Sequence, residues 1–230
     1  MAAKTWPSAA AAVADIGDGA TVMIGGFGGS GFPGDLVKAL RDHGARDLTI
    51  IANNLGGSHL SVGLLMRAHQ VRRALCSFPI GRRQKGAEET FWEQFGLEPG
   101  DVEVELVPQG TLSERIRAGG AGIAAFYTPT AAGTPLSEGK EVRAFAGRDH
   151  LLETALSADF ALVRADVADE AGNLTYRKAQ RNFNVPMATA AAVTVAEVRR
   201  VVALGELDPE QVVTPGIYVR RVVVATGADL

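Results

Sequence analysis

The chain has 230 residues, of which 47% are hydrophobic and 21% are charged. A chain of this size and apolarity can bury a full core, which excludes disorder as its main state. Its 23 basic and 26 acidic residues give a formal net charge of -3, which argues against a nucleic-acid binder because such proteins carry a basic surplus. The single cysteine, Cys76, excludes an internal disulfide and a CxxC metal site, and indicates a reduced, cytoplasmic protein.

The first residues predict a helix and not a targeting segment. The alanine run after Ser8 is interrupted by Asp15 and Gly17, and Ser8 is a suitable N-cap for a short helix. No stretch reaches the roughly 18 consecutive apolar residues that a membrane span needs, so we expect no membrane partner. The four histidines are scattered without metal-ligand spacing, so no metal site is predicted.

The next segments predict a strand, a helix and a second strand. Residues 21–24 form a short β-branched run, which a glycine cluster follows. A helical pattern then opens after Pro33 and stops at Gly44. Residues 48–52 are apolar on both faces, which is typical of a strand inside a parallel sheet. We therefore expect a right-handed βαβ unit.

The same alternation continues toward the C-terminus. Helices are expected at residues 60–69, 87–95 and 111–118, the last of them ended by Gly119-Gly120. Residues 126–150 are rich in proline and glycine and predict loops, except for a β-hairpin near 142–153. Further strands are expected at residues 71–77, 102–107, 160–164, 193–197, 201–204 and 218–225. The pattern predicts one α/β domain over 1–230, with an open, mostly parallel sheet flanked by helices.

The glycine cluster permits more than one interpretation. Gly26, Gly28 and Gly31 form G-x-G-x-x-G between a strand and a helix, as in dinucleotide-binding proteins. The acidic residue that would hold the ribose is absent, because Asn53-Asn54 stands at the end of the next strand. A nicotinamide site of a dehydrogenase, a tight turn that needs positive φ, and contact with another anionic ligand all remain open. No Lys-Ser/Thr pair follows, which excludes a P-loop.

A longer pattern surrounds this cluster and comprises Asp18-Gly19, the apolar run 22–24, Gly25-Gly26-Phe27, and then Gly31 and Pro33. This pattern resembles the signature of the first family of coenzyme A transferases. Five more segments are similar to the A (or α) subunit of that family, namely 53–54, 107–130, 158–165, 172–184 and 213–223. The resemblance extends over nearly the whole chain and is closest to transferases that act on 3-oxo acids.

The resemblance implies covalent catalysis by a glutamate that lies on a partner, the B subunit, in a hetero-oligomer. Small acyl-CoA and carboxylic acid molecules would be the substrates, with coenzyme A itself a substrate and no permanently bound cofactor. It implies transfer from succinyl-CoA to a 3-oxo acid, with 3-oxoadipate expected, and with acetoacetate, acetate or butyrate as alternatives. A non-catalytic CoA-binding or docking module is a further alternative.

Two amides are the candidate catalytic residues. Gln109 follows a strand and precedes a helix, and its side chain offers an uncharged N–H donor to an oxyanion. Asn53 stands at the end of another strand, and the resemblance implies that it lines the site. The alternatives are a local backbone bond for Gln109 and an Asx turn for Asn53 or Asn54. We expect the loop to face coenzyme A through Gly25, Gly26, Phe27, Gly28, Gly29, Ser30 and Gly31.

Other features are given simpler interpretations. Glu103 and Glu105 share one face of an alternating strand and are expected to face solvent. Cys76 is expected to be buried. The segment 81–101 is long and carries three aromatic residues, which could form the rim of the cleft or an oligomer contact. A basic cluster is expected to face the cleft or the partner, and it comprises Arg177, Lys178 and Arg181.

Overall fold

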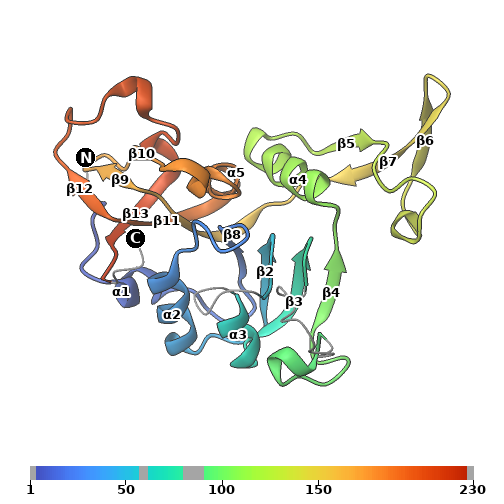
Figure 1. Cartoon of the computed structure of the whole chain (residues 1–230), viewed down its shortest axis with the longest axis horizontal. Helices are drawn as coiled ribbons and strands as arrows, with labels where there is room; N and C mark the ends of the chain where they lie inside the picture. Colours follow the sequence, from blue (N-terminus) through green and yellow to red (C-terminus); the bar gives the residue numbers. More distant parts are fainter. Residues whose placement is uncertain (1–3, 57–61, 80–90, 227–230) are drawn as a thin grey trace.

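The computed structural model describes residues 4–56, 62–79 and 91–226, and its main feature is a seven-stranded sheet (Figure 1). All neighbouring strands in this sheet are parallel, as expected. The strand order is β13 (Val219–Val224), β11 (Ala191–Val198), β8 (Ala158–Arg164), β1 (Thr21–Ile24), β2 (Leu48–Ala52), β3 (Val71–Cys76) and β4 (Glu103–Leu106).

Helices cover both faces of this sheet, and each face has its own apolar core. On one side lie α1 (Ala9–Val13), α2 (Gly34–His43) and α3 (Gly63–Arg67), and on the other lie α4 (Gln109–Ala121) and α5 (Asn184–Thr189) (Figure 1). Strand β1 shows the division, because Val22 and Ile24 pack in the first core and Met23 in the second. A strand that is buried on both faces has a continuous run of apolar residues, and this run is why the sequence predicts β1.

The predicted βαβ unit is confirmed in its local details. The Ser8 side chain accepts a hydrogen bond from the Ala11 amide and caps α1. Helix α2 buries Leu36, Val37 and Leu40 and ends at Gly44, which adopts a left-handed conformation with φ of 84°. The helix predicted at 60–69 is confirmed over Gly63–Arg67, while its first residues lie outside the described part of the chain.

The helix predicted at 87–95 is wrong over the residues that the structure describes. Residues 87–90 lie outside them, and the remainder forms only a single 3-10 turn, η1 (Glu93–Phe95), which Gly96 ends with φ of 67°. Phe91 lies edge-on to both Trp92 and Phe95, with ring centroids 4.7 and 5.4 Å apart. Phe95 is 2% exposed in the first core, so these aromatic rings pack against the body of the protein.

Helix α4 does not end at Gly119-Gly120 as predicted, but continues to Ala121. A Cβ on Gly119 would lie 2.0 Å from the Leu156 carbonyl oxygen, and one on Gly120 would lie 2.3 Å from Thr189 Oγ1. These glycines therefore permit close packing of α4 against its neighbours. The helix ends instead at Gly122, whose φ is 71°.

Two small sheets accompany the main one. The predicted hairpin is confirmed as β6 (Val142–Phe145) and β7 (Arg148–Thr154), joined by Ala146 and Gly147. Both joining residues have positive φ, which a two-residue hairpin turn requires. Strand β5 (Ala125–Thr128) pairs with β7, so the prediction of loops throughout 126–141 was wrong at its start. This sheet projects from the body (Figure 1). The other sheet comprises β10 (Leu174–Thr175), β9 (Val167–Asp169) and β12 (Arg200–Val202).

Arg115 joins the projecting sheet to the edge of the main sheet. Its guanidinium donates to Glu105 Oε1 at 2.9 Å and to the Thr154 carbonyl oxygen at 2.8 Å, and lies 3.7 Å from the Glu153 carboxylate. Glu105 is therefore partly buried and paired, which corrects the expectation of a solvent-facing side chain. Burial opposes ionisation of Glu105, but hydrogen bonds from Arg115 and Arg73 hold its pKa below the usual value.

Replacing Arg115 is expected to destabilise the fold strongly. In Arg115→Met the carboxylate of Glu153, which is 3% exposed, loses one of the two cationic neighbours that it has in the described part of the chain, and the free energy of unfolding should fall by about 3 kcal/mol. Urea denaturation at pH 7 measures this change. Arg117→Met is the matched control, because Glu114, one turn away at the surface, is the one ion-pair partner of Arg117 among the described residues, and this variant should unfold like the parent. Equal midpoints for the two variants would contradict the assignment.

Candidate functional site

The candidate residues follow neighbouring strands at the carboxyl edge of the main sheet. The glycine-rich loop follows β1, Asn53 follows β2, and Gln109 begins α4 just after β4. In Figure 1 the arrows of β2, β3 and β4 all point toward α4. In open α/β sheets the crevice beyond the carboxyl ends of the strands is where ligands bind. The topology therefore brings together the residues that the sequence singled out.

A chain of side-chain amides connects three of these segments. Gln109 Nε2 donates to Asn53 Oδ1 at 2.8 Å, and Asn53 Nδ2 donates to Asn54 Oδ1. The amide of Gly28 in the glycine-rich loop reaches the same Asn54 oxygen at 3.4 Å. Asn53 is 0% exposed, whereas Gln109 is half-buried. The Gln109 amide thus has a fixed orientation at the surface of the sheet edge.

These bonds differ from the local alternatives considered for the same residues. Gln109 bonds a side chain 56 residues away and not its own helix turn. The backbone oxygen of Asn53 accepts from the Ser77 and Phe78 amides, at 3.2 and 3.0 Å, and so continues the pairing of β2 with β3. Among the described residues, neither Asn53 nor Asn54 makes the side-chain bond of an Asx turn.

The glycine-rich loop is a tight hairpin with a buried base and an exposed tip. Phe27 and Ser30 exchange two backbone hydrogen bonds of 3.0 and 2.9 Å. Gly28 and Gly29 between them have φ of 58° and 102° and leave open space where a Cβ would stand. Phe27 is 44% exposed. The tip, from Phe27 to Ser30, is therefore the part of the loop that a ligand can contact.

The other loop glycines face the protein. A Cβ on Gly25 would lie 1.8 Å from Asn184 Oδ1, and one on Gly26 would lie 2.4 Å from the Phe32 ring. At Gly31 an added Cβ would lie 2.8 Å from Asn182 Nδ2. Close packing thus accounts for three of the glycines that the sequence had placed on a surface facing coenzyme A.

The start of α2 argues against a dinucleotide site. A pyrophosphate would bind the free N–H groups at this helix start, but Leu36 N–H already donates to Glu197 Oε2 at 3.0 Å. Glu197 is 1% exposed and is ion-paired with Arg164. Burial raises the pKa of Glu197, and the adjacent Arg164 guanidinium opposes that rise. The protein's own carboxylate therefore fills the position that a dinucleotide phosphate would need.

Sequence reasoning missed two polar side chains close to the site. Ser77 Oγ and Thr111 Oγ1 are buried, and neither has a hydrogen-bond partner among the described residues. Ser77 directly follows β3, and Thr111 lies in the first turn of α4 beside Gln109. A polar residue immediately after a parallel strand, as at Ser77, was the available signal. Unpartnered buried hydroxyls are costly unless a ligand or water completes them.

Cys76 and the basic cluster lie near the same edge. Cys76 is buried as expected, and burial raises the pKa of its thiol to about 12, so it is not a thiolate nucleophile at neutral pH.

The basic cluster lies on the 3-10 turn η3 (Lys178–Arg181). Lys178 and Arg181 belong to this turn, Arg177 caps it, and all three are exposed. Asn182, which ends this turn, donates to the Ser30 carbonyl oxygen at 3.1 Å and so places the cluster beside the glycine-rich loop.

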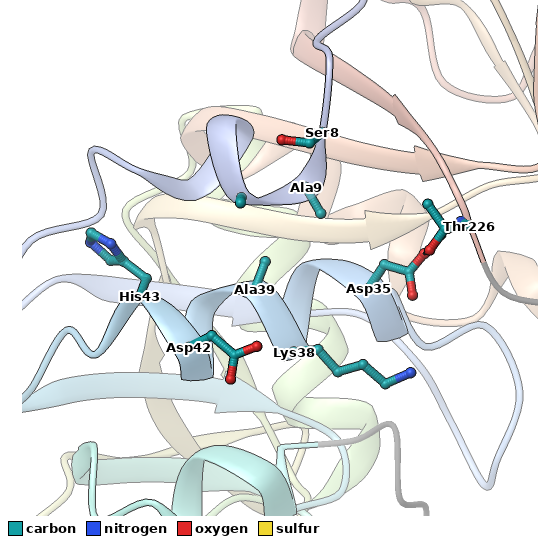
Figure 2. Close-up of a pocket in the computed structure, with 9 residues that line it drawn as sticks. Ser8, Ala9, Asp35, Lys38, Ala39, Asp42, His43 and Thr226 are labelled. Carbon is teal, nitrogen blue, oxygen red and sulfur yellow. Dashed lines mark hydrogen bonds between the residues drawn. The ribbon is translucent and has the colours of Figure 1, made fainter.

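A surface pocket of about 470 Å³ lies between α1 and α2 (Figure 2). Asp35 accepts bonds from the Thr226 amide and hydroxyl, at 2.7 and 2.8 Å, on one wall, and Lys38, Asp42 and His43 continue along α2. None of the candidate site residues lines this pocket. The sheet edge and not this pocket is therefore the candidate site.

Metal-binding clusters and membrane-spanning helices are both missing from residues 4–56, 62–79 and 91–226. These residues contain no group of three or more histidine, cysteine, aspartate or glutamate side chains arranged to hold a metal ion. The same ranges contain no helix that is long and apolar enough to cross a membrane.

Comparisons with known proteins agree with this geometry. A model of the coenzyme A transferase family matches residues 7–225. The chain is 51% identical to the A subunit of 3-oxoadipate CoA-transferase from Pseudomonas putida, over 99% of this chain and 96% of that protein. It is 46% identical to the human mitochondrial succinyl-CoA:3-ketoacid coenzyme A transferase 2, of which it spans only 45%. A solved decarboxylase built from AibA and AibB is 28% identical, with a TM-score of 0.80 over 99% of this chain and 86% of that one.

Proposed function

The chain belongs to the coenzyme A transferase family and is an enzyme of CoA transfer, and we propose that it is the A subunit of a two-subunit 3-oxoacid CoA-transferase. In this proposal the pair moves CoA from succinyl-CoA to 3-oxoadipate. The observation that carries it is the 51% identity to the A subunit of a 3-oxoadipate CoA-transferase over nearly the full length of both chains. The fold alone would not suffice, because it also serves a decarboxylase.

The proposed chemistry begins with a glutamate of the B subunit. Its carboxylate attacks the succinyl-CoA carbonyl carbon, and collapse of the tetrahedral adduct expels CoA thiolate and leaves a succinyl-glutamyl anhydride. The thiolate then attacks the glutamyl carbonyl, which releases succinate and forms a glutamyl-CoA thioester. The carboxylate of the 3-oxo acid repeats these steps in reverse and leaves as its CoA ester. No proton is transferred, so the site needs oxyanion donors and no general base.

Gln109 is suited to be one such donor. Its Nε2 carries two protons, and the bond to Asn53 Oδ1 uses one of them and leaves the other for a ligand oxygen. Asn53 accepts from Gln109 and donates to Asn54, and these two bonds hold the Gln109 amide in its orientation before substrate arrives. A donor oriented in advance stabilises the developing negative charge without reorganisation. In this proposal Asn53 orients Gln109 and lines the site.

Coenzyme A would lie against the tip of the glycine-rich hairpin. Phe27 offers an apolar ring to the pantetheine arm, and Gly28 and Gly29 let its backbone approach closely. Arg177, Lys178 and Arg181 lie beside the same loop and offer positive charge to a phosphate of CoA or to the partner. Coenzyme A is then a substrate, and no permanently bound cofactor takes part.

Acetoacetate is a second candidate acceptor, because the name of the human relative specifies 3-ketoacids in general and not 3-oxoadipate. Assays of the chain together with its B subunit separate the two candidates. We expect kcat/KM for 3-oxoadipate to exceed that for acetoacetate by at least about tenfold, because pocket contacts to a few groups discriminate by about 1–3 kcal/mol each. The reverse order would favour acetoacetate, a 3-oxo acid with a single carboxylate, as the acceptor. Absence of transfer to either acid would indicate a non-catalytic binding module.

A further inference from the structure

One buried side chain, Asn184, contacts both ends of the glycine-rich hairpin. At the far end Asn184 Nδ2 donates to the Gly31 carbonyl oxygen at 2.9 Å. At the near end Gly25 has no side chain, and a Cβ there would lie 1.8 Å from Asn184 Oδ1. Asn184 is 0% exposed and begins α5, and 153 residues separate it from Gly31 along the chain. The hairpin thus closes around an amide that a distant helix supplies.

The remaining bonds of Asn184 fix this amide to the rest of the fold. Its Oδ1 accepts from the Arg164 backbone amide, at the end of β8, at 2.9 Å. Its Nδ2 also donates to the Gln180 carbonyl oxygen at 2.8 Å. Both protons and one lone pair of the amide are therefore used. A buried amide with its bonds satisfied resists displacement, because moving it leaves several polar groups unpaired.

Asn182 adds a second contact from the same segment. Its Nδ2 donates to the Ser30 carbonyl oxygen at 3.1 Å and to the Ala179 carbonyl oxygen at 2.7 Å. At the tip of the hairpin, Asn54 Oδ1 accepts a hydrogen bond of 3.4 Å from the Gly28 amide. The hairpin is thereby held between the 180–184 segment and the Asn53-Asn54 segment of the candidate site.

We propose that Asn184 is a positioning residue, which fixes the glycine-rich hairpin over the Gln109–Asn53 pair so that its exposed tip is presented to the acyl-CoA. The influence of Asn184 on acyl-CoA binding rests on the proposed function, whereas its influence on the position of the hairpin does not. Asn184 touches no reacting atom, and its influence passes through the Gly25 and Gly31 backbone. In this proposal the 172–184 segment, which resembles the corresponding segment of the transferases, fixes the position of the glycine-rich hairpin.

Hydrogen exchange of the 25–31 amides, measured by mass spectrometry on the chain paired with its B subunit, tests the positioning directly. Asn184→Ala should speed this exchange by about tenfold or more, because the bond to Gly31 is lost. The KM for succinyl-CoA should rise about tenfold, while kcat changes by less than about threefold. Asn182→Ala removes the bond to Ser30 but leaves the bond from Asn184 to Gly31, so it should have the same effect to a smaller degree. It also removes the local bonds of Asn182 to the Ala179 carbonyl oxygen and from the Phe183 amide.

Asn173→Ala is the matched control. Asn173 bonds Asp169 and the Gly216 amide near β9 and has no hydrogen bond to the hairpin. Its loss should lower the thermal midpoint without a selective increase in exchange at 25–31. A further variant, Gly25→Ala, places a methyl group where the Asn184 amide stands and should reproduce the loop effect. In the Asn184→Ala background the same methyl has room, so it should add less than about threefold.

The outcomes separate the inference from the function that it supports. Exchange at 25–31 that stays at the parent rate in Asn184→Ala and Asn182→Ala overturns the positioning role. Additive effects of Gly25→Ala and Asn184→Ala overturn it as well. Faster exchange with an unchanged KM supports the hold on the hairpin, and instead contradicts the proposed contact between the hairpin and coenzyme A.

Discussion

Purified without a partner, the chain is expected to transfer no CoA from succinyl-CoA to any 3-oxo acid. The proposed nucleophile is a glutamate of the B subunit, and two carboxylates of this chain near the sheet edge are occupied. Glu105 is held by Arg73 and Arg115, and Glu197 is held by Arg164 and the Leu36 amide. A carboxylate held in an ion pair that is at least partly buried is a poor nucleophile, because attack would leave the arginine unpaired.

The measurement compares this chain, its B subunit and the mixture of the two, with loss of succinyl-CoA and formation of the new thioester followed together. Activity should appear only in the mixture. Borohydride treatment in the presence of succinyl-CoA should modify one glutamate of the partner and none of this chain. Transfer by a preparation that mass spectrometry shows to contain this chain alone would contradict the assignment of the nucleophile to the partner.

Elements set by short-range pattern were predictable. Strands β1 and β2 are apolar runs with turn residues on either side, and Gly44 ends α2 by its left-handed conformation, which local sequence encodes. The wrong predictions of secondary structure arose where long-range tertiary contacts determine the conformation. Gly119 and Gly120 look like a helix end, but they lie inside α4 because Leu156 and Thr189 pack against them. Strand β5 forms because β7, which lies 20 or more residues further along the chain, pairs with it. The local sequence of β5 gives no sign of that pairing.

The site shows the same division. Asn53 and Gln109 were chosen as candidates because each follows a strand, and parallel strands end at one edge, and because the family resemblance implies a role for both. Their direct hydrogen bond depends on the strand order β2-β3-β4, which the sequence does not reveal. The hydrogen bond from Asn184 to the glycine-rich loop was not predictable from the sequence. Helix α5 lies beside the loop because β8 and β11, the strands on either side of α5 in the chain, pair with each other next to β1. Long-range packing accounts for Gly25, Gly26 and Gly31, whereas Gly28 and Gly29 at the exposed tip have open space where a Cβ would stand.

Gln109→Ala is expected to lower kcat of the reconstituted enzyme on the order of 10²–10³-fold, with a smaller change in KM for succinyl-CoA. The reason is that the amide proton left free by Asn53 would contact the oxygen only when it becomes an oxyanion. An interaction made only in the transition state is lost from kcat and hardly from ground-state binding. Steady-state kinetics with saturating 3-oxoadipate and varied succinyl-CoA measures both parameters. A decrease below about threefold would reduce Gln109 to a structural residue.

Two further variants test whether donation, and not packing, is responsible. Gln109→Glu has nearly the same size but places negative charge beside the developing oxyanion, so it should be at least as slow as Gln109→Ala. Asn53→Ala keeps the donor but removes the acceptor that orients it, and its loss of kcat should be intermediate. If Gln109→Glu instead retained parental kcat, an N–H donor at this position would be unnecessary. The amide chain from Asn54 to Gln109 would then serve only to join β2 to α4.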